Sequence, residues 1–145
     1  MTIILDSETT GLIPRQDELL QLAIIDDQEN VLFNEYIRPV RKTEWKKAES
    51  INGISPDMVK DKQPISAFKD QIQEIINSAD TIIGYNLQYD LSFLMGSIFT
   101  FFIFFTSHPF VSIGSSFHKA LLFHLRFAEP CNSSGKTCGV FRWGF

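Results

Sequence analysis

The sequence predicts an α/β domain in which helices pack against a mixed β-sheet. Three observations support this prediction. Apolar runs of strand length occur in residues 3–5, 19–27 and 31–37, and residues 64–79 carry one amphipathic helical stripe. The order through residue 94 is three strands, helices, a strand and a helix, which is typical of a sheet covered by helices. A chain of 145 residues is long enough to bury the core of one such domain.

Four segments are predicted as strands. Residues 3–5 are an apolar run of the kind found in strands that are buried on both faces. Residues 19–27 and 31–37 predict the next two strands, and the short polar links between the three strands indicate an antiparallel meander. Residues 81–85 predict the fourth strand.

Helices are predicted between the third and fourth strands and after the fourth. Residues 43–50 predict a short helix with Thr43 as its N-cap, and Ser55 and Pro56 are a typical N-cap and first position of a second helix. The third helix, residues 64–79, presents one apolar stripe made of Ile65, Phe68, Ile72, Ile75, Ile76 and Ala79. Asn86 is a natural N-cap for a last helix, which would carry Asp90 in its first turn.

Two acids follow the first apolar run. Because residues two apart in a strand project from the same face, Asp6 and Glu8 are expected to lie side by side near the strand's end. Their mutual repulsion in a poorly solvated place would be relieved by a raised pKa or by a bound cation. Gly11 would then allow a sharp turn and a close approach of backbone N–H groups to a ligand. For a bare Asp-x-Glu, a strand that ends in solvated acids is the alternative.

The residues around these acids resemble a known family. Residues 6–12, Asp-Ser-Glu-Thr-Thr-Gly-Leu, resemble the first motif of the DEDD superfamily of 3′–5′ exonucleases, the DnaQ-like proofreading exonucleases. Residues 82–94 are similar to the second motif of that family, an apolar-Asn-x-x-aromatic-Asp-x-x-Phe-Leu pattern. The resemblance covers about residues 1–94 and implies a ribonuclease H-like fold with two divalent metal ions held by four acidic residues.

The resemblance also implies roles for individual residues. Asp6, Glu8 and Asp90 match the acids that bind Mg²⁺ or Mn²⁺, ions that prefer hard oxygen ligands, and they are therefore the expected catalytic residues. The residues that match positions against the substrate are Thr9, Thr10, Gly11, Leu12, Asn86 and Phe93. For Asn86 a helix cap is the alternative, and for Leu12 and Phe93 the alternative is packing in the core.

The third motif of the family, a His or Tyr base followed about five residues later by the fourth acid, is not found. No Asp follows Asp90, and His124 with Glu129 has that spacing but the wrong acid. Residues 95–145 contain one of the 17 acids and 11 of the 14 phenylalanines, so their composition differs from that of residues 1–94.

We therefore expect an N-terminal part of an exonuclease domain in residues 1–94 and an atypical Phe-rich tail in residues 95–145, out of frame or disordered, which would leave the fold incomplete at its C-terminus. Two alternatives to an exonuclease stay open: a non-catalytic truncated or frameshifted remnant, and a partner-binding module with a hydrophobic tail.

Composition narrows the expected partners and location. The net charge of −4 argues against a sequence-independent nucleic-acid coat, which would be basic, but not against a nuclease whose acids bind metal ions. The expected partners are the 3′ end of a single strand and a DNA polymerase. The two cysteines, the lack of a secretory signal and the lack of a membrane-length apolar run favour the cytoplasm.

Overall fold

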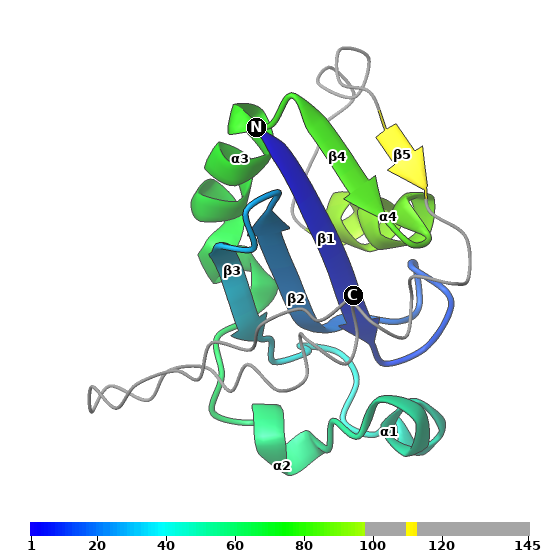
Figure 1. Ribbon diagram of the computed structural model, residues 1–145. Helices are drawn as coiled ribbons and strands as arrows, with labels where there is room; N and C mark the ends of the chain where they lie inside the picture. The colour runs from blue at the N-terminus through cyan, green and yellow to red at the C-terminus, as the bar shows by residue number, and fades with distance from the viewer. Residues whose placement is uncertain (98–109, 113–145) are drawn as a thin grey trace.

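The computed structural model describes residues 1–97 and 110–112. Its centre is a five-stranded sheet with the order β3-β2-β1-β4-β5 (Figure 1). The strands are β1 (Thr2–Thr9), β2 (Leu19–Asp26), β3 (Val31–Tyr36), β4 (Thr81–Gly84) and β5 (Phe110–Ser112). The first three strands form an antiparallel meander, whereas β4 is parallel to β1 and β5 is parallel to β4. The predicted mixed sheet is thus confirmed.

Strand β1 runs on beyond its neighbour β4. Only Thr2, Ile3 and Ile4 pair with β4, although β1 continues to Thr9. Its pairing with β2 shifts register between Glu8 and Thr9, a bulge of the kind that re-aims side chains near functional sites. The last half of β1 therefore has an edge that is open to residues other than those of β4.

The helices fill the gaps that the strands leave in the sequence. They are α1 (Lys46–Asn52), α2 (Pro56–Val59), a 3₁₀ turn η1 (Ile65–Phe68), α3 (Lys69–Ser78) and α4 (Leu87–Ser97). Helices α1 and α2 lie at the end of the sheet where β1 ends (Figure 1). Helices α3 and α4 share one core cluster with the sheet, in which Ile72 and Phe93 pack with Leu5. The flanking helices are therefore held by apolar burial, the main favourable contribution to folding.

Most of the predicted helix signals are confirmed. The stripe expected in residues 64–79 is the buried side of η1 and α3, with Ile72 and Ala79 fully buried and Ile65, Phe68 and Ile75 packed against the core. Pro56 occupies the first turn of α2 after Ser55, as expected, although the Ser55 side chain makes no capping hydrogen bond. Among the strands, the one predicted for residues 19–27 is confirmed as β2, which ends at Asp26.

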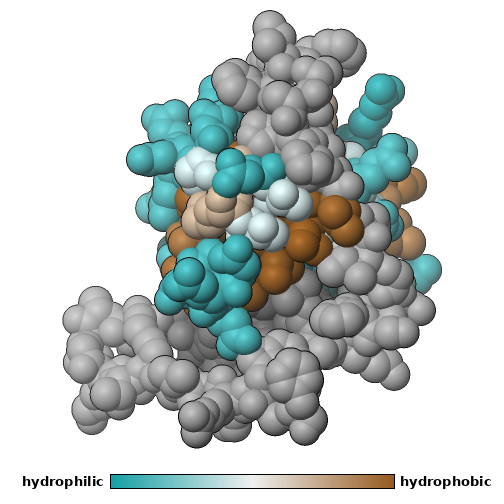
Figure 2. All heavy atoms as spheres, turned by 45° about the horizontal axis from the view of Figure 1, so that its top comes forward, coloured by the Kyte–Doolittle hydropathy of each residue, from teal (hydrophilic) through white to brown (hydrophobic). Residues whose placement is uncertain are grey.

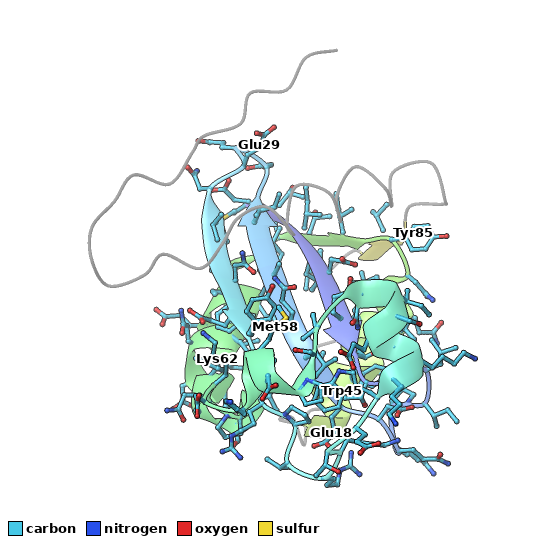
Figure 3. All side chains as sticks on the ribbon, turned by 90° about the horizontal axis from the view of Figure 1, so that it is seen from below. Glu18, Glu29, Trp45, Met58, Lys62 and Tyr85 are labelled. Carbon is cyan, nitrogen blue, oxygen red and sulfur yellow. The ribbon has the colours of Figure 1, made fainter. Side chains whose placement is uncertain are left out.

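The predicted start of the first helix is wrong. Thr43 is not its N-cap, because α1 begins at Lys46 after Trp45. The reason is tertiary: the indole N–H of Trp45 donates to the carbonyl oxygen of Ile54 at 2.7 Å, and the ring is buried. Figure 3 shows Trp45 and Glu18 at one end of the sheet, whereas Glu29 lies in the β2–β3 turn at the other end. Anchoring of the Trp45 ring leaves the residues before it outside the helix.

A row of β-branched side chains crosses the sheet at a single level. Ile4 pairs with Ile25 on one side and with Ile83 on the other, and the row continues to Val31 and Val111 at the two edges. The three isoleucines are half-buried and the two valines are exposed. Figure 2, which brings the top of Figure 1 forward, shows hydrophobic residues reaching the surface between hydrophilic ones.

Within residues 1–97 and 110–112, no helix combines the length and the apolar character that a membrane crossing requires. The expectations for the Phe-rich tail beyond residue 97, residues 110–112 excepted, and for His124 and Glu129 concern residues outside those that the structure describes.

Candidate active site

The two motifs meet at the open edge of β1. The hydroxyl of Ser7 donates a hydrogen bond to Asp90 Oδ1 at 2.5 Å, although 83 residues separate them in the chain. The backbone N–H of Ser7 donates to the same carboxylate. Because β4 ends at Gly84, it does not pair with this part of β1, and the first turn of α4 takes its place. The topology of the sheet thus brings Asp90 to the segment that carries Asp6 and Glu8.

Asp90 is a buried carboxylate with a perturbed pKa. Only 3% of the residue is exposed. Burial raises the pKa of its carboxyl group to about 6; the hydrogen bonds from Ser7 oppose this rise, and the negative charge of Glu8 adds to it. Glu8 is therefore close enough to act on Asp90 electrostatically. The sequence predicts a raised pKa from the repulsion between Asp6 and Glu8, whereas the raised pKa of about 6 belongs to Asp90 and is caused chiefly by burial.

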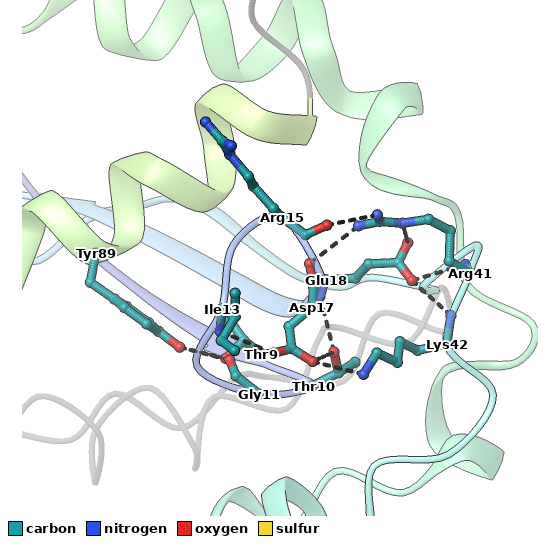
Figure 4. Close-up of polar contacts among 10 residues, drawn as sticks. All are labelled: Thr9, Thr10, Gly11, Ile13, Arg15, Asp17, Glu18, Arg41, Lys42 and Tyr89. Atoms are coloured by element: carbon teal, nitrogen blue, oxygen red, sulfur yellow. Dashed lines mark hydrogen bonds and ion pairs between the residues drawn. The ribbon is translucent and has the colours of Figure 1, made fainter.

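Tyr89 ties the second motif to the loop after the first. Its hydroxyl donates to the carbonyl oxygen of Gly11 at 2.9 Å and shares a hydrogen bond of 2.9 Å with Thr9 Oγ1 (Figure 4). Thr9 Oγ1 also reaches the Gly11 carbonyl oxygen, at 2.7 Å. The ring of Tyr89 packs against that of Phe93, with centroids 4.9 Å apart. Burial raises the pKa of the Tyr89 hydroxyl, which therefore stays protonated and can donate.

The residues expected to touch substrate differ in exposure. Leu12 is 77% exposed, so the packing alternative does not hold for it, whereas Phe93 is fully buried in the core, as the packing alternative requires. The Asn86 side chain is exposed. The backbone carbonyl oxygen of Asn86 accepts hydrogen bonds from the backbone amides of Tyr89 and Asp90, as expected of the residue before a helix. Thr9 and Thr10 are buried.

The side chains of this site carry the oxygen atoms that a divalent cation prefers as ligands, but they are not arranged to bind one together. Asp6 and Asp90 are buried carboxylates, and hard oxygen donors are what Mg²⁺ and Mn²⁺ prefer. In the described part of the chain, however, no three His, Cys, Asp or Glu side chains are grouped so that they could hold a metal ion. The structure brings Asp90 to Ser7 and places it within the field of Glu8. It does not gather Asp6, Glu8 and Asp90 into one cluster.

Asp17 is an organising residue that the sequence analysis missed. Its carboxylate accepts hydrogen bonds from the Ile13 amide at 3.0 Å and from Thr10 Oγ1 at 3.3 Å, and it forms an ion pair with Lys42 Nζ at 3.0 Å. Burial alone would raise the pKa of Asp17, but these partners outweigh it and the pKa lies below its ordinary value. A Cβ at Gly11 would lie 2.5 Å from Asp17 Oδ2. Gly11 is therefore needed for the close approach of this carboxylate, and not only for the approach to a ligand that its motif predicts.

Glu18 is the second missed residue. Its carboxylate accepts the backbone amides of Val40 at 2.9 Å, Arg41 at 2.9 Å and Lys42 at 2.8 Å. The Arg41 guanidinium lies 3.7 Å from the same carboxylate (Figure 4). Residues 15–18 belong to a short polar link, yet two acids directly before a strand whose first six residues are buried are a usable signal. Acids drawn into a core by such a strand need donors.

Comparison with known proteins agrees with this fold and site. The exonuclease family model (RNase_T) matches residues 3–123. The chain is 38% identical over 97 residues to the DNA polymerase III subunit epsilon of Rickettsia conorii, an alignment of 63% of this chain and 41% of that protein. It is 30% identical over 96 residues to the 3′–5′ exonuclease DinG of Bacillus subtilis, covering 63% of this chain and 10% of that protein. The chain thus spans less than half the length of either relative.

Solved structures of E. coli Exonuclease I show the same architecture. The complex with a dA16 oligonucleotide superimposes with a TM-score of 0.54 at 29% identity, over 63% of this chain and 22% of that one. A zinc-bound complex with single-stranded DNA gives a TM-score of 0.61 at 23% identity, over 77% of this chain and 27% of that one, which supports the ribonuclease H-like fold. With both motifs joined at the end of β1, the chain belongs to the exonuclease family, as a DnaQ-like 3′–5′ exonuclease domain.

Proposed function

We propose that this domain removes nucleotides from the 3′ ends of single-stranded nucleic acid by hydrolysing phosphodiester bonds. The observation that supports this proposal best is the contact between the two motifs, in which Ser7 bonds Asp90 and Tyr89 bonds Gly11. These contacts bring the two motifs, which lie about 80 residues apart in the chain, to one place in the fold. The oligonucleotide complex of Exonuclease I supports single-stranded DNA as the substrate class.

Asp6, Glu8 and Asp90 are the residues that would hold Mg²⁺ or Mn²⁺. Such ions activate the attacking water and stabilise the leaving oxygen of a phosphodiester. Ser7 orients the Asp90 carboxylate through two hydrogen bonds, and burial of Asp90 keeps its surroundings low in water. Because the three carboxylates are not grouped as they stand, ion binding has to draw them together. That rearrangement weakens the affinity.

The residues that would meet the strand lie around the loop after β1. Leu12 presents an exposed apolar side chain, Asn86 presents an exposed amide at the start of α4, and Gly11 offers backbone without a side chain. Thr9 and Thr10 are buried and support the loop from within through their hydroxyl groups. Phe93 supports the site from the core by packing against Tyr89.

Slow turnover is part of the proposal. Neither a general base nor a fourth acid is identified among residues 1–97, and loss of acid–base assistance typically slows a reaction by about 10²–10⁴-fold. Three acids also hold two cations less well than four. We infer that the domain binds one Mn²⁺ weakly and cleaves much more slowly than a relative with all four acids.

The test is hydrolysis of a 5′-labelled single strand by the purified chain with Mn²⁺, with a Rickettsia conorii subunit epsilon sample as the reference. Asp6→Ala should abolish both Mn²⁺ binding and the residual shortening. Asp27→Ala changes an exposed acid in the β2–β3 turn and should leave both intact. A wild-type chain with no Asp6-dependent shortening contradicts the proposed activity. A fast, Asp6-dependent rate in Mg²⁺ contradicts the slow turnover.

A DNA polymerase is the proposed partner and the cytoplasm the proposed location. The partner comes from the relatives, since subunit epsilon is by name a subunit of DNA polymerase III. The location rests on the small number of cysteines. Co-purification of the tagged chain with a polymerase subunit from its own cells would support the partner. A chain that migrates alone would argue against it.

A further inference from the structure

The loop after β1 is built around one carboxylate. This loop, residues 10–17, leaves the sheet at Thr10 and returns at the start of β2. The Thr10 amide donates to the Glu18 carbonyl oxygen at 2.8 Å, which closes the loop at its base. Inside it, Asp17 accepts the Ile13 amide and the Thr10 hydroxyl, and the Gly11 backbone lies directly against the carboxylate. The conformation of the loop therefore depends on Asp17.

The outer side of the same loop carries apolar side chains that have no place in the core. Leu12 is 77% exposed and Ile13 is 50% exposed. Exposed Leu and Ile side chains can pack against an aromatic ring without giving up other contacts, and every nucleic-acid base presents a flat ring face of this kind. The loop starts two residues after Glu8, and Tyr89 holds its Gly11 carbonyl oxygen from α4. Both side chains thus extend from the loop that connects the first motif to β2 and that Tyr89 ties to the second motif.

We propose that Asp17 is a positioning residue: through the Ile13 amide and Thr10 it holds the 10–17 loop so that Leu12 and Ile13 form a platform for the 3′-terminal base. This inference rests on the proposed exonuclease function and adds a determinant of substrate binding to it. Lys42 keeps the Asp17 carboxylate ionised by its ion pair and is held in turn by Glu18, which accepts the Lys42 amide. Asp17 itself is buried beneath the loop and does not meet the strand.

The experiment compares Asp17→Asn with a matched control, Asp26→Asn. Asp26 also organises a turn by accepting backbone amides, those of Gln28 and Asn30, but it lies at the other end of β2. Two strands serve as substrates, one with a normal 3′-terminal nucleotide and one with an abasic 3′ end. Hydrogen exchange of the 10–17 loop is measured on the same samples.

Wild type should prefer the strand with the terminal base. In Asp17→Asn, KM for that strand should rise about tenfold, which is equivalent to about 1.4 kcal/mol. The value of kcat should stay within about twofold of wild type, and the preference for the strand with the terminal base should disappear. Exchange should speed up in the 10–17 loop and not elsewhere. Asp26→Asn should keep the preference and loosen only the β2–β3 turn.

Several outcomes would overturn the inference. These are an Asp17→Asn variant that keeps the preference, a loop whose exchange does not change, or a wild-type chain that cleaves both strands equally. A loss confined to kcat would also contradict it, because a positioning residue beneath the platform acts on binding. A wild-type chain that neither binds nor shortens any strand refutes the proposed function itself, and the platform with it.

Discussion

Replacing Asp90 with asparagine should stabilise the folded chain at neutral pH, although Asp90 is a proposed metal ligand. The pKa of its carboxyl group is raised to about 6 in the folded chain, whereas an unfolded Asp titrates near ~3.9. Between these two values the folded state binds the extra proton, so the free energy of unfolding decreases as the pH rises from about 4 to about 6. The contribution is fully present below about pH 4 and is lost above the folded pKa.

The size of the effect follows from the shift. A difference of about 2 pKa units corresponds to about 3 kcal/mol, an upper limit for one buried group. Asparagine keeps one oxygen that can accept a hydrogen bond from Ser7, but it loses the strength of a bond to a charged acceptor, about 1 kcal/mol. We therefore expect Asp90→Asn to raise the free energy of unfolding by about 1–2 kcal/mol near pH 8 and to have little effect near pH 4.

Urea unfolding followed by tryptophan fluorescence, repeated across this pH range, measures the difference directly. Because other acids titrate equally in both chains, the difference between wild type and Asp90→Asn isolates this carboxyl group. Asp70→Asn removes the same charge from an exposed position on α3 and should give a curve parallel to wild type. A variant that is less stable than wild type near pH 8, or a difference that does not change with pH, would refute the reasoning.

Two further substitutions test the contacts around the site. Glu18→Gln should lower the free energy of unfolding by about 2–4 kcal/mol, because its new NH₂ group must face one of the three backbone amides that now donate to the carboxylate. Glu29→Gln, at an exposed turn, is the control. Equal urea midpoints for the two variants would contradict this expectation. Tyr89→Phe keeps the ring contact with Phe93 but removes the hydrogen bonds to Gly11 and Thr9. It should therefore lower the free energy of unfolding by about 1 kcal/mol in the same assay and speed amide exchange in the 10–17 loop. Unchanged exchange would show that the hydroxyl does not hold the loop.

The parts of the fold that were predicted correctly depend on repeated local patterns. The isoleucine stripe of α3 has a helical period that fixes its buried face, and the continuous apolar runs of β1 and β2 mark buried strands; the extents of all three agree with the prediction to within a few residues. The start of α1 was wrong because it depends on one long-range bond, from the Trp45 indole to the Ile54 carbonyl oxygen. Such a bond leaves no periodic trace in the sequence.

The residues of the candidate site also fall into those that a sequence pattern identifies and those that depend on long-range contacts. Asp6, Glu8 and Asp90 could be named because a motif marks them, but the sequence did not show that Asp90 would bond to Ser7, the residue between the two acids of the first motif. Asp17 and Glu18 were missed because each acts on backbone amides, and any residue can supply an amide. Asp17 holds the Ile13 amide and Glu18 holds three amides of residues 40–42, and their charged partners Lys42 and Arg41 lie more than 20 residues away in the chain, where no local pattern links them.

The two missed carboxylates also explain why this end of the sheet can be both acidic and ordered. Asp6 and Glu8 contribute two carboxylates to the second half of β1, and Asp90 contributes a third from the first turn of α4. Asp17 and Glu18 close the loop that follows β1, and the ion pair with Lys42 and the contact with Arg41 neutralise their charge locally. They can therefore fix the 10–17 loop and residues 40–42 without adding to the repulsion among the motif acids. An ordered loop after β1 is thus compatible with the binding of a metal ion by the motif acids.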